Sequence, residues 1–310
     1  MTAWTKTCQM RMGIAVVLAC LTTPGVPAAE KKSQRAIIQI GLVDSIFRDV
    51  PDSMVKLALR PFRELMFSQT GLRGKLISAG DALTLGEQLT SNKLQLGVFH
   101  GFEFAWAQQK YPELRPLMIA VNHHRCLHAY ILVKKDNGIE KLADLQGKKL
   151  AVPYRTREHC HLYLDHCCLE LGKEAGSFFQ IDTTSDVEAA LNSVAEGRID
   201  AVLVDGVVLS FYKKVHASLY ANLKPLKKSG VFPAAVVAYH AGAVNKKTLH
   251  RFKTGMVKAK KSTRGQQLLL MAHMTGFEPV PADFQDLLDE VAKTYPAPQH
   301  IKVSKKQQAR

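Results

Sequence analysis

The stretch LAVPYRTREHCHLYLDHCCLELG, residues 150–172, joins a short apolar strand to a helix that is dense in histidine and cysteine. Residues 150–152 are expected to form the strand. Pro153 ends it, because proline has no backbone N–H to donate to a neighbouring strand. The apolar spacing that follows predicts a helix that Thr156 caps and Gly172 terminates. The amino terminus of such a helix favours an anion, because its first N–H groups have no partner within the helix.

Outward from this stretch, short apolar strands alternate with helical patterns along the chain. Residues 36–43 predict the first strand, and residues 53–68 predict a helix that Pro61 interrupts. Further on, residues 201–204 predict a strand that leads into a helix over residues 207–214. This alternation favours the α/β class with parallel strands.

The amino-terminal residues 1–28 are typical of an export signal. Residues 13–21 form an apolar run that is too short to cross a bilayer, and small residues precede a cleavage site before Ala29. Lipoprotein processing, with a lipid on Cys20, is the alternative. The protein is therefore expected to be periplasmic or secreted, either released or anchored through Cys20.

The chain is strongly basic, with a formal net charge of +15 and a basic tail over residues 296–310. A solvated surface and attraction to an anionic ligand or membrane both remain open as explanations. Basic and aromatic residues do not interleave, so nucleic acid is not an expected partner. The remaining length is sufficient for two domains, and we expect a monomer.

Several stretches together resemble the periplasmic phosphonate/phosphite-binding proteins of ABC transporters. The matching stretches are residues 61–71, 86–99, 129–133, 138–139, 142–148 and 187–201. The most characteristic of them extends into the central stretch as DLQGKKLAV, residues 144–152. The resemblance covers most of residues 36–290.

The resemblance implies a type II periplasmic-binding-protein fold, in which two hinged three-layer α/β lobes close around a cleft. Lobe one would hold residues 36–125 and 235–295, and lobe two residues 126–234. The implied function is the capture of a small, oxyanionic ligand and its delivery to an ABC permease or a membrane sensor. Catalysis by a Cys160–His159 pair is a less favoured alternative, because nothing in the sequence orients that pair. We therefore predict a binding protein and not an enzyme.

Carrying the family pattern over places the ligand between a turn at 154–159 and a turn at 100–104. The predicted ligand-binding residues are Tyr154, Arg155, Thr156, Arg157, His159, His100, Glu103, Tyr130 and Asp205. Arg155 and Arg157 would offset the charge of Glu158, which repels an anion at the helix terminus. A carboxylate at Glu103 disfavours an anion at the other turn.

The alternative prediction is that the same fold binds a transition metal or haem. Histidine and cysteine suit zinc, copper or haem iron, and the candidate ligands are His159, Cys160, Cys126 and His128. Their spacing matches no standard metal motif, and the principal prediction includes no cofactor. Export also permits disulfides, and the three possible pairings among Cys126, Cys160, Cys167 and Cys168 stay open.

Overall fold

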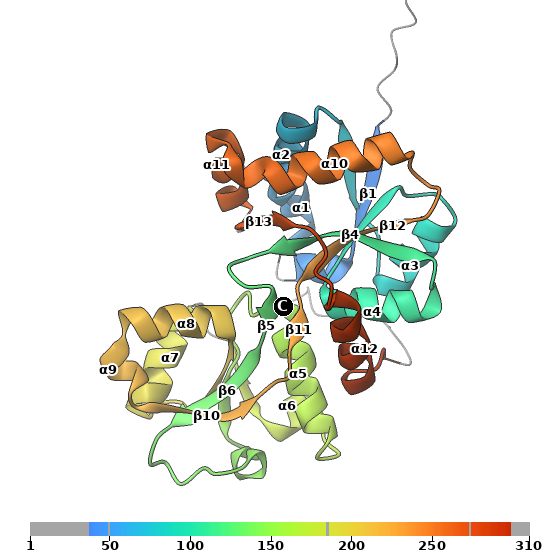
Figure 1. The fold of residues 1–310 in the computed structure, drawn as a ribbon. Coiled ribbons are helices and arrows are strands. Elements are labelled where there is room, and N and C mark those ends of the chain that lie inside the picture. The colour runs from blue at the N-terminus through green and yellow to red at the C-terminus, as the bar shows by residue number, and fades with distance from the viewer. Residues whose placement is uncertain (1–36, 49, 184–185, 273, 299–310) are drawn as a thin grey trace, which may run out of the picture. The chain divides into compact units, whose positions relative to one another are not determined.

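The chain forms two large β-sheets in the computed structural model, which describes residues 37–298 except 49, 184, 185 and 273 (Figure 1). The six-stranded sheet has the order β13-β4-β12-β3-β1-β2. Its strands are β1 (Ile38–Leu42), β2 (Gly74–Ser78), β3 (Leu96–Phe99), β4 (Leu114–Val121), β12 (Ala235–His240) and β13 (Gly276–Glu278). The pairs of β1 with β2 and β3 are parallel, and the pairs on the β12–β4–β13 side are antiparallel.

The five-stranded sheet has the order β10-β6-β9-β7-β8. Its strands are β6 (Ala129–Lys134), β7 (Lys149–Ala151), β8 (Gln180–Asp182), β9 (Ala201–Asp205) and β10 (Leu223–Lys228). Strand β7 lies parallel to β8 and β9, whereas β6 lies antiparallel to β9 and β10. A small ribbon of β5 (Cys126–Leu127) and β11 (Phe232–Pro233) forms where the chain passes between the two sheets.

Helices pack on both faces of each sheet. The short helices of the amino-terminal part are η1 (Asp44–Phe47), α1 (Asp52–Ala58), α2 (Arg60–Thr70), α3 (Ala82–Thr90) and α4 (Gly101–Lys110). The middle of the chain adds η2 (Leu142–Leu145), α5 (Glu158–Leu169), α6 (Ala175–Phe178), α7 (Val187–Glu196), α8 (Gly206–Val215) and α9 (Ala217–Tyr220). The last are α10 (Lys246–Lys258), η3 (Ala259–Lys261), α11 (Thr263–Met271) and α12 (Phe284–Thr294).

Apolar side chains assign each helix to a face. Helices α2, α10 and α11 pack with β1 and β3 in one cluster, and α3 and α4 pack in another. In the five-stranded sheet, α7 and α8 share a cluster with β9, while α5 and α6 belong to the cluster that also contains α4 and α12. The predicted three-layer α/β architecture is therefore confirmed. The lobe boundaries and the hinge motion between the lobes stay predictions.

The local predictions hold with two exceptions. The break near Pro61 is confirmed, because α1 ends at Ala58 and α2 starts at Arg60. Thr156 as the cap of the central helix is wrong: Arg157 holds the N-cap position, and the Thr156 hydroxyl donates instead to the Pro153 carbonyl at 2.6 Å. Gly172 as the helix end is late, because α5 ends at Leu169.

Two predicted segments fall outside the described residues: the export signal, and the basic tail beyond residue 298. None of the helices in the described part of the chain combines the length and hydrophobicity that a bilayer-spanning segment needs.

Phe232 connects the two halves of the core. Its side chain is fully buried, and its ring centroid lies 4.7 Å from Tyr295, 5.3 Å from His159 and 6.1 Å from Phe102. These partners come from α4, α5 and the segment after α12. The β11 position of Phe232 therefore determines how well these helices pack together.

Phe232→Ala should lower the free energy of unfolding by about 3–5 kcal/mol, because it leaves a cavity where α4, α5 and the segment after α12 meet. Urea titration followed by circular dichroism measures this change. Phe211→Ala is the matched control, because Phe211 is 66 % exposed and its loss should cost about 0.5 kcal/mol or less. Equal effects of the two substitutions would contradict the packing described here.

Candidate functional site

The turn before α5 orients the amino terminus of that helix. The Thr156 N–H donates to the Pro153 carbonyl at 3.0 Å, and Arg155 takes a left-handed backbone conformation with φ of 62°. Arg157 then caps the helix without a side-chain hydrogen bond to the first turn. The side chain of the N-cap residue therefore accepts no hydrogen bond from the backbone N–H groups of the first turn of α5.

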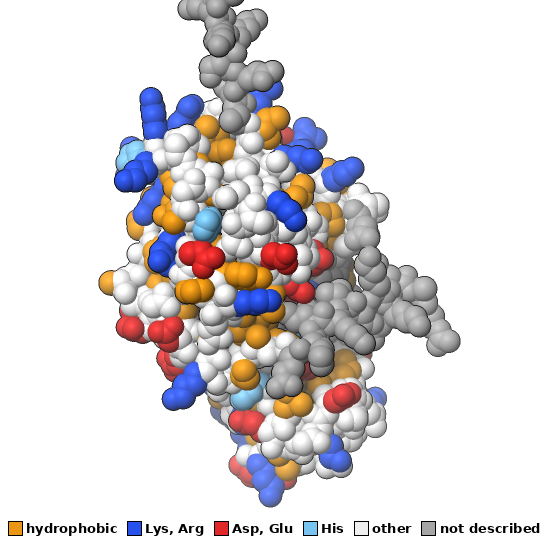
Figure 2. Space-filling model, turned by 90° about the vertical axis from the view of Figure 1, so that its right-hand side faces the viewer, with side chains coloured by type: hydrophobic (Ala, Val, Ile, Leu, Met, Phe, Trp, Pro, Cys, Tyr) orange, Lys and Arg blue, Asp and Glu red, His pale blue; other side chains and the backbone are white. Residues whose placement is uncertain are grey.

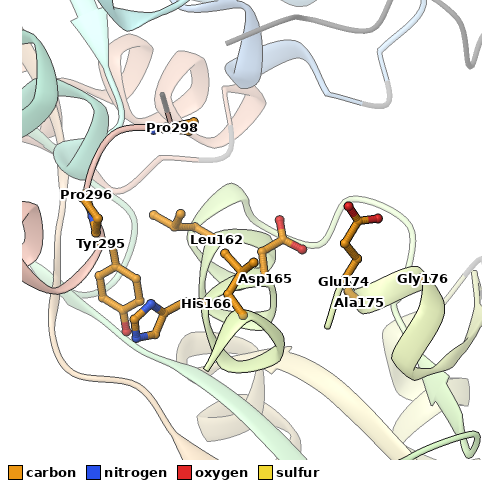
Figure 3. A pocket seen from close by; sticks show the side chains of 10 residues that line it. Leu162, Asp165, His166, Glu174, Ala175, Gly176, Tyr295, Pro296 and Pro298 are labelled. Atoms are coloured by element: carbon orange, nitrogen blue, oxygen red, sulfur yellow. The ribbon is translucent and has the colours of Figure 1, made fainter. Parts of the chain in front are cut away.

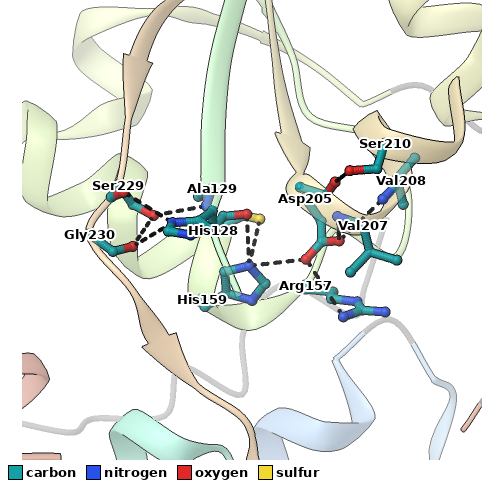
Figure 4. Close-up of polar contacts among 12 residues, drawn as sticks. His128, Ala129, Arg157, His159, Asp205, Val207, Val208, Ser210, Ser229 and Gly230 are labelled. Atoms are coloured by element: carbon teal, nitrogen blue, oxygen red, sulfur yellow. Dashed lines mark hydrogen bonds and ion pairs between the residues drawn. The ribbon is translucent and has the colours of Figure 1, made fainter. Parts of the chain in front are cut away.

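Asp205 lies at the end of β9, buried beside this helix terminus (Figure 4). Its Oδ1 accepts from the Val207 N–H at 2.7 Å, which caps α8. Its Oδ2 lies 3.1 Å from Nε2 of His159 and 3.6 Å from Nη1 of Arg157. Burial by itself raises the pKa of Asp205, but His159, Arg157 and the Val207 N–H together hold the pKa below its ordinary value. Asp205 is thus a buried carboxylate that fixes Arg157 and His159.

His159 faces several electron-rich atoms in the same place. Besides Asp205, its Nε2 lies 3.4 Å from the His128 carbonyl oxygen and 3.5 Å from Sγ of Cys160. Burial raises the pKa of the Cys160 thiol well above its ordinary value, which favours the neutral form. His159, Cys160 and Asp205 offer ligand atoms within 4.8 Å of one another.

The other two predicted metal ligands lie apart from this group. Cys126 is exposed, and Nδ1 of His128 lies 3.3 Å and 3.2 Å from the carbonyl oxygens of Ser229 and Gly230. Two of the four predicted ligands thus come together, joined by Asp205, and metal or haem binding stays a prediction. Cys126, Cys160, Cys167 and Cys168 are all free thiols in the described part of the chain.

The second predicted turn forms the start of α4. His100 occupies the N-cap position, and Gly101 follows where a Cβ atom would come within 2.3 Å of the Pro233 carbonyl oxygen. Only glycine permits so close an approach of the helix to the β11 segment. His100 is half-buried with its Nε2 atom buried, and its ring stacks on Phe102 at 5.7 Å. Burial lowers the pKa of His100 to about 4. His100 is therefore neutral at physiological pH.

Glu103 projects from the first turn of α4 into a buried environment. The Ser45 hydroxyl, from η1, donates to this carboxyl over distances of 2.8 and 2.9 Å to its two oxygens. Burial is the largest influence and raises the pKa of Glu103 to about 8, although the Ser45 hydrogen bond acts in the opposite direction. Glu103 is therefore mostly protonated at pH 7. A protonated carboxyl has no charge, so Glu103 does not repel an anion as the sequence analysis expected.

An ion pair connects the α5 turn with the segment after η1. Glu158, the first residue of α5, pairs with Arg48 from the segment after η1, and Nη2 of Arg48 lies 2.5 Å from Oε1 of Glu158. The Glu158 side chain is mostly buried, whereas that of Arg48 is about half exposed. Arg48 therefore belongs to the candidate site, although the sequence analysis did not include it.

Seven of the nine predicted ligand-binding residues fall into three sets, and the other two, Thr156 and Glu103, lie in the turns described above. Arg157, His159 and Asp205 lie together, and His100 lies near them, since Glu158, His159 and Arg157 all influence its pKa. Tyr154 is exposed, and the Arg155 guanidinium lies over its ring at 5.6 Å. Tyr130 lies in β6, with Lys228 over its ring at 5.6 Å. Ser45 and Arg48 were missed, because no local pattern indicates their partners 58 and 110 residues away.

A separate cavity of about 550 Å³ lies between α5, α6 and the segment after α12 (Figure 3). Its lining includes Leu162, Asp165, His166, Glu174 and Tyr295. None of the predicted site residues lines this cavity. It is a concave surface on α5, away from the amino terminus of the helix.

Glu103→Gln should change the pH dependence of stability. Because the folded pKa of about 8 lies above the ordinary value of 4.5, the stabilising contribution of Glu103 is fully present below about pH 4.5 and is lost as the pH rises through 8. We subtract the free energy of unfolding of Glu103→Gln from that of the wild type. This difference should decrease from pH 5 to pH 9, as urea titrations at each pH would show. A difference that rises over this range would contradict the assignment.

Comparison with known proteins identifies the family. A family model described as "ABC transporter, phosphonate, periplasmic substrate-binding protein" matches residues 48–284. None of the curated proteins matches the chain.

Solved structures share the fold at low sequence identity. XAC2383 from Xanthomonas citri bound to chloride ion is 16 % identical with a TM-score of 0.58, and the match covers 84 % of this chain and 97 % of that one. PhnD1 from Prochlorococcus marinus, in complex with methylphosphonate, is 14 % identical with a TM-score of 0.54 over 83 % and 97 % of the two chains. The binding protein PA3383 of an ABC phosphonate transporter from Pseudomonas aeruginosa is 14 % identical with a TM-score of 0.53 over 84 % and 88 %. The predicted type II periplasmic-binding-protein fold is confirmed, and the chain belongs to the family of periplasmic substrate-binding proteins of phosphonate ABC transporters.

Proposed function

We propose that this chain captures a small phosphorus oxyanion of the phosphonate or phosphite type and presents it to an ABC permease. The family match supports this role, because residues 48–284 include the α4 and α5 termini and Asp205. The proposed setting is the periplasm, with a monomer released by cleavage before Ala29 or anchored by a lipid on Cys20. The proposed capture requires neither a cofactor nor a catalytic residue.

Arg157 is the observation that carries the proposal. Its side chain is 29 % exposed, at the amino terminus of α5, and Asp205 holds its guanidinium at 3.6 Å. A guanidinium presents a planar set of donors that matches two oxygens of a phosphonate. The helix terminus adds N–H groups and a favourable dipole in the same place. The amino terminus of α5 therefore combines a positive charge, hydrogen-bond donors and a guanidinium that Asp205 holds in place.

The α4 turn is compatible with the same ligand. With its pKa near 8, Glu103 carries a proton at pH 7, and a protonated carboxyl offers a donor instead of a charge. The lowered pKa of His100 keeps its ring neutral. The turn therefore does not oppose an anion that Arg157 holds, as it would with an ionised Glu103.

Glu158 is an internal competitor in this proposal. Its carboxylate lies in the first turn of α5 and pairs with Arg48, so it occupies a cationic environment that an oxyanion would share. Binding of the ligand would then displace Glu158 from Arg48 or draw Arg48 toward the ligand. The affinity would reflect the balance between the ligand oxygens and this carboxylate.

Arg157→Gln should weaken binding of methylphosphonate or phosphite about 10- to 100-fold, because it removes a charged hydrogen-bond donor from the ligand. Isothermal titration calorimetry in a phosphate-free buffer measures the dissociation constants. Arg63→Gln is the matched control, because Arg63 is exposed on α2 and should leave the affinity unchanged. The proposal fails if the wild-type chain binds none of methylphosphonate, phosphite, phosphate and an alkyl sulfonate.

Glu158→Gln should strengthen oxyanion binding several-fold, because it removes a negative charge from the helix terminus and keeps the size of the side chain. The same calorimetric titration gives the ratio to wild type. Glu64→Gln, which breaks an exposed ion pair within α2, controls for a general change in net charge. Weaker binding by Glu158→Gln would show that Glu158 supports the ligand and does not compete with it.

The metal alternative has its own test. Elemental analysis of protein purified without an affinity tag measures the amount of metal bound per chain. If a metal binds at this site, His159→Ala should lower that amount. A substoichiometric metal content in the wild-type chain rejects the alternative.

A further inference from the structure

Basic residues are concentrated in one part of the chain. From residue 206 to residue 277 the sequence contains 13 lysines and arginines and no aspartate or glutamate. Three of these lysines pair with acidic groups elsewhere, namely Lys224 with Glu140, Lys227 with Glu170 and Lys260 with Glu278. Within the described residues, Lys247, Lys258 and Lys261 are in no ion pair. Eight of the 13 lie between residues 246 and 264, on α10, η3 and the start of α11, and the exposed Lys213 and Lys214 lie apart from them on α8.

The pattern of α10 places this charge on one side of the helix. Phe252 and Met256 are buried against the six-stranded sheet. Lys247, Arg251 and Lys258 are exposed, and their spacing of four and then seven residues places them on the opposite face. Lys261 in η3 and Arg264 in α11 extend the exposed charge past the end of the helix.

Helix α2 packs beside α10 and continues this surface. Arg60, Arg63 and Phe67 are exposed and share one face of α2 by their spacing of three and then four residues. The Arg251 guanidinium lies against Gly71, directly after α2, so the basic face of α10 reaches the carboxyl end of α2. Figure 2 views the side of the molecule that carries the amino-terminal end of α10, and lysine and arginine side chains lie on the upper part of that side.

Large apolar side chains are exposed on the same helices. Phe67 on α2 is 48 % exposed, and Leu270 and Met271 on α11 are 76 % and 63 % exposed. Helix α11 packs on α2 and follows η3 directly. Basic residues interspersed with exposed leucine, methionine and phenylalanine are typical of a surface that lies on an anionic bilayer, where the basic groups meet the headgroups and the apolar ones enter the interface.

We propose that the α2–α10–α11 surface docks on membranes that contain anionic phospholipid. The charge of the surface selects the lipid class, because an uncharged headgroup offers no partner for the unpaired lysines. This docking is independent of the ligand site, whose residues lie on other elements. It would keep the protein near the bilayer in which a permease resides.

Vesicle sedimentation tests the proposal with the full chain. We expect binding to vesicles of phosphatidylcholine with 30 % phosphatidylglycerol, at least fivefold less binding to phosphatidylcholine alone, and loss of the difference in about 0.5 M salt. The triple variant Lys247→Glu, Lys258→Glu, Lys261→Glu should reduce the bound fraction at least fivefold. Circular dichroism melting verifies that each variant is folded.

A matched triple variant separates this surface from net charge. Lys149→Glu, Lys173→Glu and Lys214→Glu make the same change in charge at exposed positions outside α2, α10 and α11, and should leave binding within twofold of wild type. Both triples keep the same termini, so any contribution of the termini cancels. Equal loss in the two triples, or equal wild-type binding to both kinds of vesicle, would overturn the proposal.

Discussion

A carboxylate that leaves water must be matched by hydrogen-bond donors or positive charge, and Asp205 meets this requirement in a way that fixes the candidate site. Its two oxygens face the start of α8 on one side and His159 with Arg157 on the other. The end of β9, the start of α8 and the start of α5 are thereby tied to one buried charge. The proposed position of the ligand beside Arg157 depends on this arrangement.

The fold was largely predictable because its determinants are local. Apolar runs separated by helical patterns specify strands and helices wherever they occur, and Pro61 marks the break between α1 and α2 for a steric reason. The stretch DLQGKKLAV, residues 144–152, indicated the family, which the family model confirms. The cap of α5 was misassigned, because the helix begins one residue later than expected, at Glu158, and Arg157 takes the N-cap position.

The site was predictable only in part, because its electrostatics depend on contacts between distant residues. Arg157, His159 and Asp205 were predicted from the sequence as ligand-binding residues, but the sequence did not indicate that they lie within contact distance of one another. The charge state of Glu103 could not be inferred, since it follows from burial beside Ser45, and the partner of Glu158 is Arg48, 110 residues away. The basic stretch from 206 to 277 gained meaning only when α10 and α2 were seen to adjoin.

Amide hydrogen exchange, measured by mass spectrometry with and without saturating methylphosphonate, tests most directly whether the ligand sits at the α5 terminus. The account predicts slower exchange in peptides that cover residues 154–162 and 205–208, because the ligand would hold Arg157 and the network of Asp205 in place. Slower exchange confined to residues 162–176 and 295–298, around the cavity in Figure 3, would contradict it.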